Sequence, residues 1–281
     1  MRIFRTTQGN VIESDGQYFL SASSNWDSFL NRDDLFQALK SEIQSLSPNG
    51  DLATLLSKET LAPIVSQEVW ASGVTYLRSR EARMEESKDS GGGDFYAKVY
   101  DAERPELFFK ATAARTVGPG AQVLIRRDSM WNVPEPELTL CMASSGKIIG
   151  YTIGNDMSSR DIEGANLLYL PQAKVYRHSC ALGPFIRIAA TEAEAREWAI
   201  RLAITRNGQT EFSGETSVGK IKRTFPELAR WLFQSQEFSQ GAILLTGTGL
   251  VPPNEFTLAA GDHVRIEISG IGVLENTVVV V

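Results

Sequence analysis

From about residue 69 onward, the chain is a succession of short apolar runs, rich in β-branched residues and separated by turns. These runs cover residues 147–154, 184–190, 199–209, 241–249 and 262–280. Only two strong helical patterns interrupt them, at residues 191–199 and 225–234. A doubly wound fold would alternate strands and helices regularly, and this chain does not. The pattern therefore predicts an α+β domain that is mainly β.

The first 68 residues have a different pattern, which predicts a small N-terminal α+β lobe. Alternating apolar residues within the first 22 positions predict a hairpin, and residues 33–46 have helical spacing with acidic residues at their start. Residues 47–70 read as a connection followed by a strand. We place the boundary near residue 69, which gives a small domain at 1–68 and a larger domain at 69–281.

The charge of the chain excludes several classes of partner. The 281 residues are 42% hydrophobic and carry a net charge of −6. No basic cluster interleaves with aromatic residues, so a nucleic-acid partner is not expected. No apolar run approaches the length of a membrane span, and the first 20 residues do not resemble a signal peptide. We therefore expect a cytoplasmic protein without a membrane partner, in which Cys141 and Cys180 are buried free thiols.

The segment NVPEPEL places two acidic residues two positions apart. On an extended chain the side chains of Glu135 and Glu137 leave the same face, and Pro134 and Pro136 stiffen the backbone between them. Two carboxylates in one small volume are costly unless a cation or a shared proton neutralises them. The alternative is an acidic edge that is simply solvated.

A third acidic residue, Asp156, follows the strand-like run KIIGYTIG and precedes a turn into a helix. The end of a strand is a usual place for a functional side chain, although an aspartate there can also be only a turn residue or a helix cap. Three carboxylates without histidine or cysteine beside them suit a hard divalent ion. The sequence thus predicts a site for Mg2+, with Mn2+ or Ca2+ as substitutes.

Several familiar catalytic motifs are absent from the sequence. It has no GxxxxGK[ST] phosphate loop, no HExxH and no GxSxG, and GTGLVPP lacks the third glycine of a dinucleotide fingerprint. Its two histidines, His178 and His263, read as structural residues. A glycine run at 91–93 reads either as a mobile segment near a site or as a surface linker. These absences argue against kinases, zinc proteases, serine hydrolases and nicotinamide enzymes.

Four separated motifs resemble the fumarylacetoacetate hydrolase superfamily when taken in order. They are RPELFFKAT, PEPELTL, the run from GNDMSSRDIEG through LYLPQAK to CALGP, and LLTGTGLVPP with a closing GDHVRIEI. The resemblance covers roughly residues 70–281 and is strongest to the branch of 2-keto-3-deoxy-D-arabinonate dehydratases. It implies a mixed β-sandwich or roll for the larger domain and a homodimer or homotetramer.

The resemblance also implies roles for individual residues. It makes Glu135, Glu137 and Asp156 the metal ligands, in agreement with the argument from their spacing. It places an active-site lysine at Lys174, for which the alternative is a solvated lysine.

Further residues take their expected roles from the upstream and downstream motifs. Glu106 matches the acid/base glutamate of the dehydratase branch, with a solvated glutamate as the alternative, and Lys110 and Thr248 match positions that line the substrate pocket. Hydrolytic and decarboxylating relatives carry a histidine where Ser79 stands here, followed by a glutamate one turn later. Cleavage of a carbon–carbon bond is therefore disfavoured.

These residues together predict a reaction. A 2-keto acid can chelate a hard cation, which makes the proton on C3 more acidic, and a hydroxyl can then leave from C4. Such a step needs one base and one acid, and the sequence does not say which of Glu106 and Lys174 plays which part. The expected activity is dehydration of a 2-keto-3-deoxy sugar acid to 2,5-dioxopentanoate. The alternatives are a hydrolase or decarboxylase acting on an acylpyruvate-type diketo acid, or a metal-stabilised binding protein.

Overall fold

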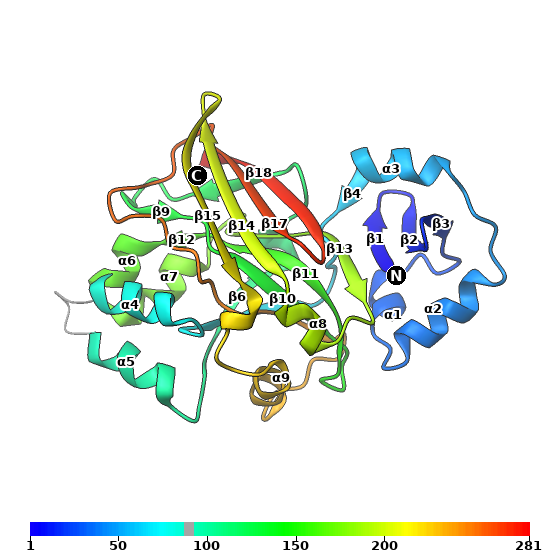
Figure 1. Ribbon diagram of the computed structural model, residues 1–281, viewed down its shortest axis with the longest axis horizontal. Coiled ribbons are helices and arrows are strands. Elements are labelled where there is room, and N and C mark those ends of the chain that lie inside the picture. Colours follow the sequence, from blue (N-terminus) through cyan, green and yellow to red (C-terminus); the bar gives the residue numbers. More distant parts are fainter. Residues whose placement is uncertain (87–92) are drawn as a thin grey trace.

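The computed structural model describes residues 1–86 and 93–281. Most of the glycine run that the sequence singles out, at 91–93, lies outside the described residues. In Figure 1 the first 60 or so residues form the blue part at one side, and the remaining strands and helices form the larger part. No described helix has the length and apolar character needed to cross a membrane.

A large mixed sheet runs through the whole molecule in the strand order β3-β2-β1-β13-β11-β10-β16-β5-β6. Most neighbours are antiparallel, but β16 and β5 are parallel, as are β13 and β7. The strands are β1 (Arg2–Thr6), β2 (Gly9–Ser14), β3 (Gln17–Leu20), β4 (Thr60–Leu61), β5 (Glu68–Gly73), β6 (Glu106–Thr112), β7 (Thr116–Val117), β10 (Pro136–Met142), β11 (Ile148–Asp156), β13 (Cys180–Ile188) and β16 (Ala242–Leu245). Because β1 pairs with β13, the N-terminal hairpin extends the sheet of the larger part.

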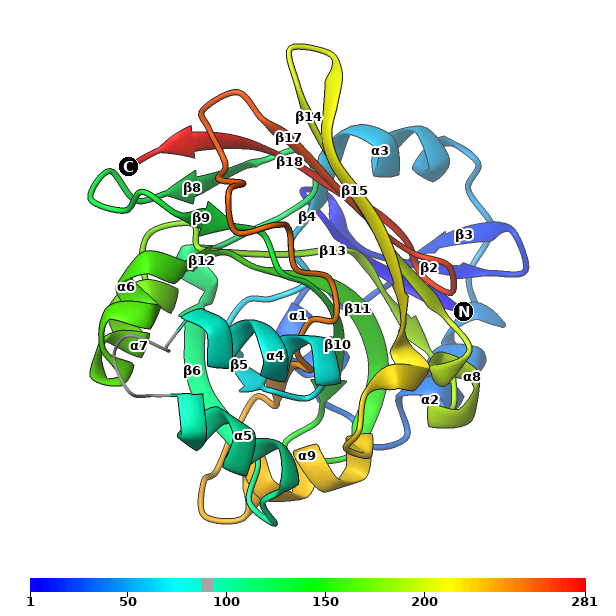
Figure 2. The ribbon, with the colours of Figure 1, turned by 60° about the vertical axis from the view of Figure 1, so that its left-hand side comes forward.

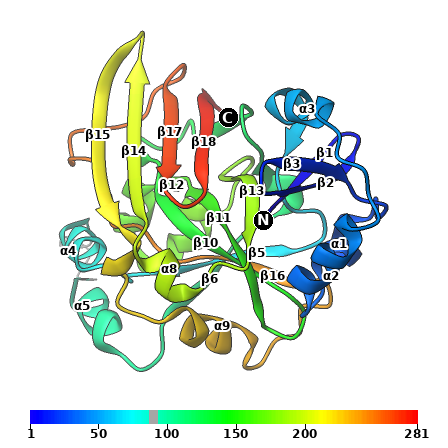
Figure 3. The same cartoon turned by 45° about the vertical axis from the view of Figure 1, so that its right-hand side comes forward.

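A second sheet packs across the first in the order β15-β14-β17-β18-β8 (Figure 3). Its strands are β8 (Gln122–Ile125), β14 (Ala199–Arg206), β15 (Gln209–Ser217), β17 (His263–Ile268) and β18 (Gly272–Val280). A short pair, β9 (Asn132–Val133) with β12 (Ser158–Ser159), lies beside the start of β10. The expectation of a mainly β, α+β fold with mixed sheets is confirmed.

The described helices pack around the two sheets. They are α1 (Trp26–Leu30), α2 (Leu35–Ile43), α3 (Asp51–Glu59), α4 (Leu77–Glu86), α5 (Gly93–Asp101), α6 (Arg160–Ala165), α7 (Leu170–Lys174), α8 (Glu192–Arg196) and α9 (Phe225–Phe233), with short 3-10 turns at Ala113–Arg115, Leu167–Tyr169 and Val218–Lys220. In Figure 2, α4, α5 and α6 lie together near β5 and β6.

One local prediction was wrong, because residues 51–59 form helix α3 and not a connection. Leu52 and Leu55 are buried at i, i+3 spacing and supply the apolar face that fixes the helix against the N-terminal hairpin. The surrounding polar and turn-forming residues hid this short periodic signal. The predicted helices at residues 33–46, 191–199 and 225–234 are confirmed as α2, α8 and α9.

Two hydrophobic clusters fill the interior. One lies between the two sheets and includes Leu138, Ile153 and Ile266. The other joins residues of the N-terminal segment, such as Trp26 and Phe29, to buried residues in strands of the larger part: Val69, Cys141, Ile186 and Ile243. The first 60 residues therefore bury much of their apolar surface against the sheet that carries the candidate site. Cys141 and Cys180 are buried free thiols, as predicted.

Candidate active site

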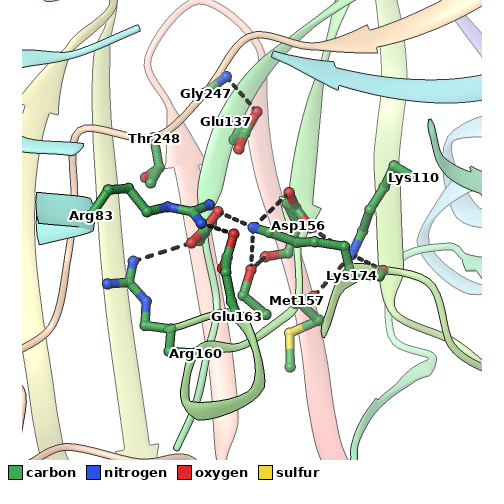
Figure 4. Close-up of polar contacts among 12 residues, drawn as sticks. Arg83, Lys110, Glu137, Asp156, Met157, Arg160, Glu163, Lys174, Gly247 and Thr248 are labelled. Atoms are coloured by element: carbon green, nitrogen blue, oxygen red, sulfur yellow. Dashed lines mark hydrogen bonds and ion pairs between the residues drawn. The ribbon is translucent and has the colours of Figure 1, made fainter. Parts of the chain in front are cut away.

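Three carboxylates meet where β10 and β11 run side by side. Glu137 lies within β10, Glu135 directly precedes that strand, and Asp156 is the last residue of β11. All three are buried, and an oxygen from each lies within 4.8 Å of the others. The alternation of an extended chain brings Glu135 and Glu137 to the same face, as the spacing predicts. The structure thus brings the three predicted metal ligands together; Glu137 and Asp156 are labelled in Figure 4.

Lys174, the last residue of α7, projects into this group of acids. Its Nζ donates to Glu135 Oε2 at 2.8 Å, to Asp156 Oδ2 at 3.1 Å and to Ser158 Oγ at 2.6 Å. The lysine is fully buried, so the alternative of a solvated lysine is excluded. Its ammonium has three hydrogens and three oxygen acceptors, which is the condition for burying such a charge.

Lys110, in β6, is also fully buried and approaches Asp156 from the other side. Its Nζ lies 2.5 Å from Asp156 Oδ1 and donates to the carbonyl oxygens of Met157 and Lys174 at 2.9 and 2.6 Å. Lys110 is not among the residues that line the cavity described below. In the described chain it holds Asp156 and the end of α7 in place.

The two glutamates of the trio differ in their electrostatic surroundings. Burial alone would raise the pKa of Glu135, but Lys174, Arg160 and Arg83 together lower it below its usual range. Arg160 lies in direct contact, with one guanidinium nitrogen 3.1 Å from Glu135 Oε1. Glu135 is therefore an ionised carboxylate held by positive side chains.

Glu137 lacks such compensation. Burial raises the pKa of its carboxyl, and the negative charges of Asp156 and Glu135 raise it further, well above the usual value. The Gly247 amide donates to Glu137 Oε2 at 2.6 Å, which opposes the rise only in part. A positive charge placed among the three acids would relieve this repulsion.

A small cavity opens beside the carboxylates and encloses about 20 Å³, which is room for one ion or one water molecule. The predicted residues that line it are Glu135, Glu137, Asp156, Lys174 and Thr248. The others are Ser72, Gly73, Val74, Ser79, Arg83, Phe108, Arg160 and Gly247. Thr248 is buried, and its Oγ1 is bonded within its own loop, to Leu250.

Glu106, the first residue of β6, is not among the lining residues but lies directly behind the wall that Gly73 forms. The residue as a whole is half-buried, yet its Oε2 is shielded from solvent and has no hydrogen-bond partner among the described residues. Burial raises the pKa of its carboxyl; Arg83 and Lys174 lower it, and Glu135 and Asp156 raise it. The net rise favours a carboxyl that keeps its proton at a higher pH than usual.

Sequence reasoning missed Arg83, Arg160 and Glu163. Arg83 forms a buried ion pair with Glu163, which joins α4 to α6 (Figure 4). The available signal was helical spacing, because Ser79 and Arg83 stand one turn apart on the buried face of α4.

The donors of the trio fit a hard divalent cation. All are carboxylate oxygens, they converge from two adjacent strands, and Glu137 is the acid that the lysines neutralise least. Soft ligands are missing, since neither histidine lies among the residues lining this cavity. The site is therefore one for a divalent metal.

The sequence of the chain matches a known protein family. The model of the fumarylacetoacetate (FAA) hydrolase C-terminal family matches residues 69–279. The chain belongs to this family, as its motifs suggested.

Similar proteins indicate which class of enzyme this chain is. A probable 2-keto-3-deoxyxylonate dehydratase of Haloferax volcanii is 45% identical over 226 residues, which are 80% of this chain and 77% of that protein. The 2-dehydro-3-deoxy-D-arabinonate dehydratase of Saccharolobus solfataricus is 44% identical over 213 residues, 75% and 72% of the two chains. A solved 2-keto-3-deoxy-D-arabinonate dehydratase complexed with magnesium and 2,5-dioxopentanoate has a TM-score of 0.84 at 34% identity, covering 100% and 99%. The chain is an enzyme of the hydro-lyase class.

Proposed function

We propose that this enzyme removes water from a 2-keto-3-deoxypentonate, such as 2-dehydro-3-deoxy-D-arabinonate, to give 2,5-dioxopentanoate with Mg2+ as cofactor. The observation that carries the proposal is a protonatable carboxyl, Glu106, and a buried lysine, Lys174, which both interact with a trio of carboxylates that fits a hard cation. The similarity to two dehydratases at 44–45% identity supports the choice of substrate.

The metal ligands in this proposal are Glu135, Glu137 and Asp156. When bound, the cation would stabilise the negative charge that develops on the keto oxygen as C3 loses its proton, and its charge would lower the pKa of the nearby lysine. Lys110 holds Asp156 beside the other two carboxylates, because it bonds Asp156 Oδ1 and two backbone carbonyl oxygens at once.

In this proposal Glu106 and Lys174 each carry out one of the two proton transfers of the dehydration. Burial raises the pKa of Glu106, so this carboxyl suits the acid that gives a proton to the hydroxyl leaving C4. Lys174, which lies among Glu135, Asp156 and Ser158, is the proposed base at C3. Burial lowers the pKa of its ammonium, but Asp156 and Glu135 raise it above the usual value; a bound cation would oppose those two charges and favour the neutral amine that a base requires. After water has left, C5 loses a proton and C3 gains one as the double bond moves to C4 and C5, and the enol becomes an aldehyde when its hydroxyl loses a proton and C4 gains one. The pentonate thus loses one water and no carbon.

An anionic substrate requires positive charge near a site rich in acids. Arg83 and Arg160 line the cavity and bring that charge, and Thr248 is among the other lining residues. The enclosed 20 Å³ is smaller than a five-carbon acid, so substrate entry requires these walls to move apart.

The experiment that tests the proposal compares two substrates. Purified enzyme with Mg2+ is incubated with 2-keto-3-deoxy-D-arabinonate and, separately, with an acylpyruvate, and the products are followed by NMR. Water loss from the first and no cleavage of the second is expected, and chelation of the metal should stop the reaction. Cleavage of the acylpyruvate with no change in the sugar acid would reject the proposal. Ser79 argues against that outcome, because hydrolytic relatives carry a histidine at this position. Its hydroxyl donates to the Tyr76 carbonyl oxygen just before α4.

We also propose that the protein assembles as a homodimer or homotetramer through residues 69–281. Support comes from Val280, the last residue of β18, and the following Val281, which are 45% and 37% exposed, and from Met130 and Leu168, which are more than 80% exposed. Sedimentation at micromolar concentration should give a mass of two or four chains. A monomer mass that is independent of concentration would reject this.

A further inference from the structure

Gly73 and Glu106 are register partners at one end of the antiparallel pair of strands β5 and β6, which lie side by side in Figure 2. Gly73 is the last residue of β5, and Glu106 is the first residue of β6. Side chains of directly opposite residues on antiparallel strands lie on the same face, about 5 Å apart at their Cβ atoms. Because Gly73 has no side chain, the space that a side chain there would occupy is available to Glu106.

The carboxyl of Glu106 occupies that space. A Cβ atom built on Gly73 would lie 1.9 Å from Glu106 Oε2, 2.7 Å from its Cδ and 3.5 Å from its Cγ. These are the three nearest atoms, so the collision would involve this one side chain first. The Glu106 side chain therefore folds back over the Gly73 backbone.

The backbone itself gives no reason for a glycine at position 73. Its φ lies outside the left-handed region that favours glycine, unlike that of Gly247 nearby, which has a φ of 93°. Alanine would fit the strand conformation. The requirement at this position is thus steric and concerns Glu106.

The contact also shields the carboxyl. Glu106 Oε2 is buried without a hydrogen-bond partner among the described residues, while Gly73 itself lines the cavity beside the metal trio. Glu106 therefore lies against a residue that lines the cavity, and a side chain at position 73 would occupy the place of its carboxyl.

We propose that Gly73 is a positioning residue, whose missing side chain admits the Glu106 carboxyl to the cavity wall. The inference rests on the proposed role of Glu106 as the acid of the dehydration. A side chain at position 73 would take the place of the Glu106 carboxyl and displace it, so the acid would be lost to the reaction although it is still present in the chain.

The test is Gly73→Ala in the full-length enzyme. The colliding atoms are the far end of a flexible side chain, so the fold should accommodate alanine and the Mg2+ affinity measured by calorimetry should be unchanged. Turnover should fall about a hundredfold to ten-thousandfold, the range expected for loss of a positioned proton donor. Gly50→Ala is the matched control, because a Cβ there meets open space, and it should keep full turnover.

A double-mutant cycle shows whether the effect passes through Glu106. If it does, Gly73→Ala adds little to the loss caused by Glu106→Gln, because the two changes remove the same group. Losses that multiply would overturn the proposal, as would full turnover in Gly73→Ala.

A second readout separates this inference from the proposed function. Carboxyl NMR titration of the metal-free protein should show the pKa of Glu106 closer to its ordinary value in Gly73→Ala than in the wild type. An unchanged titration overturns the role of Gly73. Full turnover in Glu106→Gln instead overturns the acid role of Glu106, whatever the titration shows.

Discussion

Two networks of charged residues in this molecule use the same residue types in opposite surroundings. On the outer face of the five-stranded sheet, Arg201 bonds Glu215 and Glu267 at 2.6 and 3.0 Å, with side chains that are 27–57% exposed. At the end of β10 and β11, Lys174 bonds Glu135 and Asp156 at similar distances, with side chains that are at most 5% exposed. Short distances alone therefore do not distinguish a functional network from a surface one.

The difference lies in what burial costs. The exposed pairs stay solvated whether or not they form, so each contributes little to stability. The buried acids and lysines lose their hydration, so their charges are stable in the interior only while every charged partner is present. Glu137 is the exception within the buried group, since repulsion from Asp156 and Glu135 adds to its burial. We infer that the cation, not folding stability, explains why this acid is there.

The largest expected effect comes from removing that acid. Glu137→Gln should weaken Mg2+ binding at least about a hundredfold and should abolish turnover. The effect should exceed that of removing a residue that only hydrogen-bonds to a metal ligand. Isothermal calorimetry measures the affinity. Glu215→Gln removes an exposed carboxylate of the outer network and should change neither property. Equal metal affinity in Glu137→Gln and wild type would exclude this ligand.

Lys174→Met should lower turnover by about a hundredfold to ten-thousandfold, because it removes the proposed base while keeping a side chain of similar length. Steady-state kinetics with saturating Mg2+ measures this change. Lys222→Met is a fair control, because Lys222 is a surface lysine paired with Asp101. Near-full turnover in Lys174→Met would show that the base lies elsewhere.

The buried pair between Arg83 and Glu163 gives a test by stability. Arg83→Met leaves Glu163 buried and uncompensated, so it should lower the free energy of unfolding by about 3–5 kcal/mol. Arg201→Met on the outer sheet should cost about 1 kcal/mol or less. Urea unfolding of both variants measures the contrast. Changing Glu163 to Met as well should recover much of the lost stability. Equal losses of stability in Arg83→Met and Arg201→Met would contradict the distinction between the buried and the exposed network.

A smaller effect concerns pH. The pKa of Glu106 is raised in the folded chain, so between its ordinary value of 4.5 and the raised value the folded state binds more protons than the unfolded state. Its contribution is complete below about pH 4.5 and is lost as the pH rises through the folded value. The stability of the metal-free wild type relative to Glu106→Gln should therefore decline with rising pH. A difference that is constant across pH would contradict the raised pKa.

The sequence predicts the parts of the site that depend on local spacing. Glu135 and Glu137 share a face because they are two apart on an extended chain, and Asp156 ends a strand that its apolar run makes recognisable. The mainly β fold follows from the same alternation.

The parts of the site that depend on packing between distant segments could not be predicted in this way. Arg83 reaches Glu163 across 80 positions, and Lys110 bonds residues 46 to 64 positions away, so neither contact leaves a local pattern. Nothing in the run RPELFFKAT indicates that Lys110 supports Asp156 without lining the cavity. Likewise, the steric role of Gly73 appears only when β5 and β6 are paired.

The central claim is that the buried acids and lysine carry out a dehydration, and the most direct test follows the fate of the carbon chain. The wild type with Mg2+ is incubated in D2O with 2-keto-3-deoxy-D-arabinonate, and the products are read by carbon and proton NMR. We expect 2,5-dioxopentanoate with all five carbons retained and deuterium at C3 and C4, because both carbons take up a proton from solvent as the double bond moves towards C5 and the enol becomes the aldehyde. Two smaller fragments, or a substrate that stays unchanged and free of deuterium, would contradict the claim.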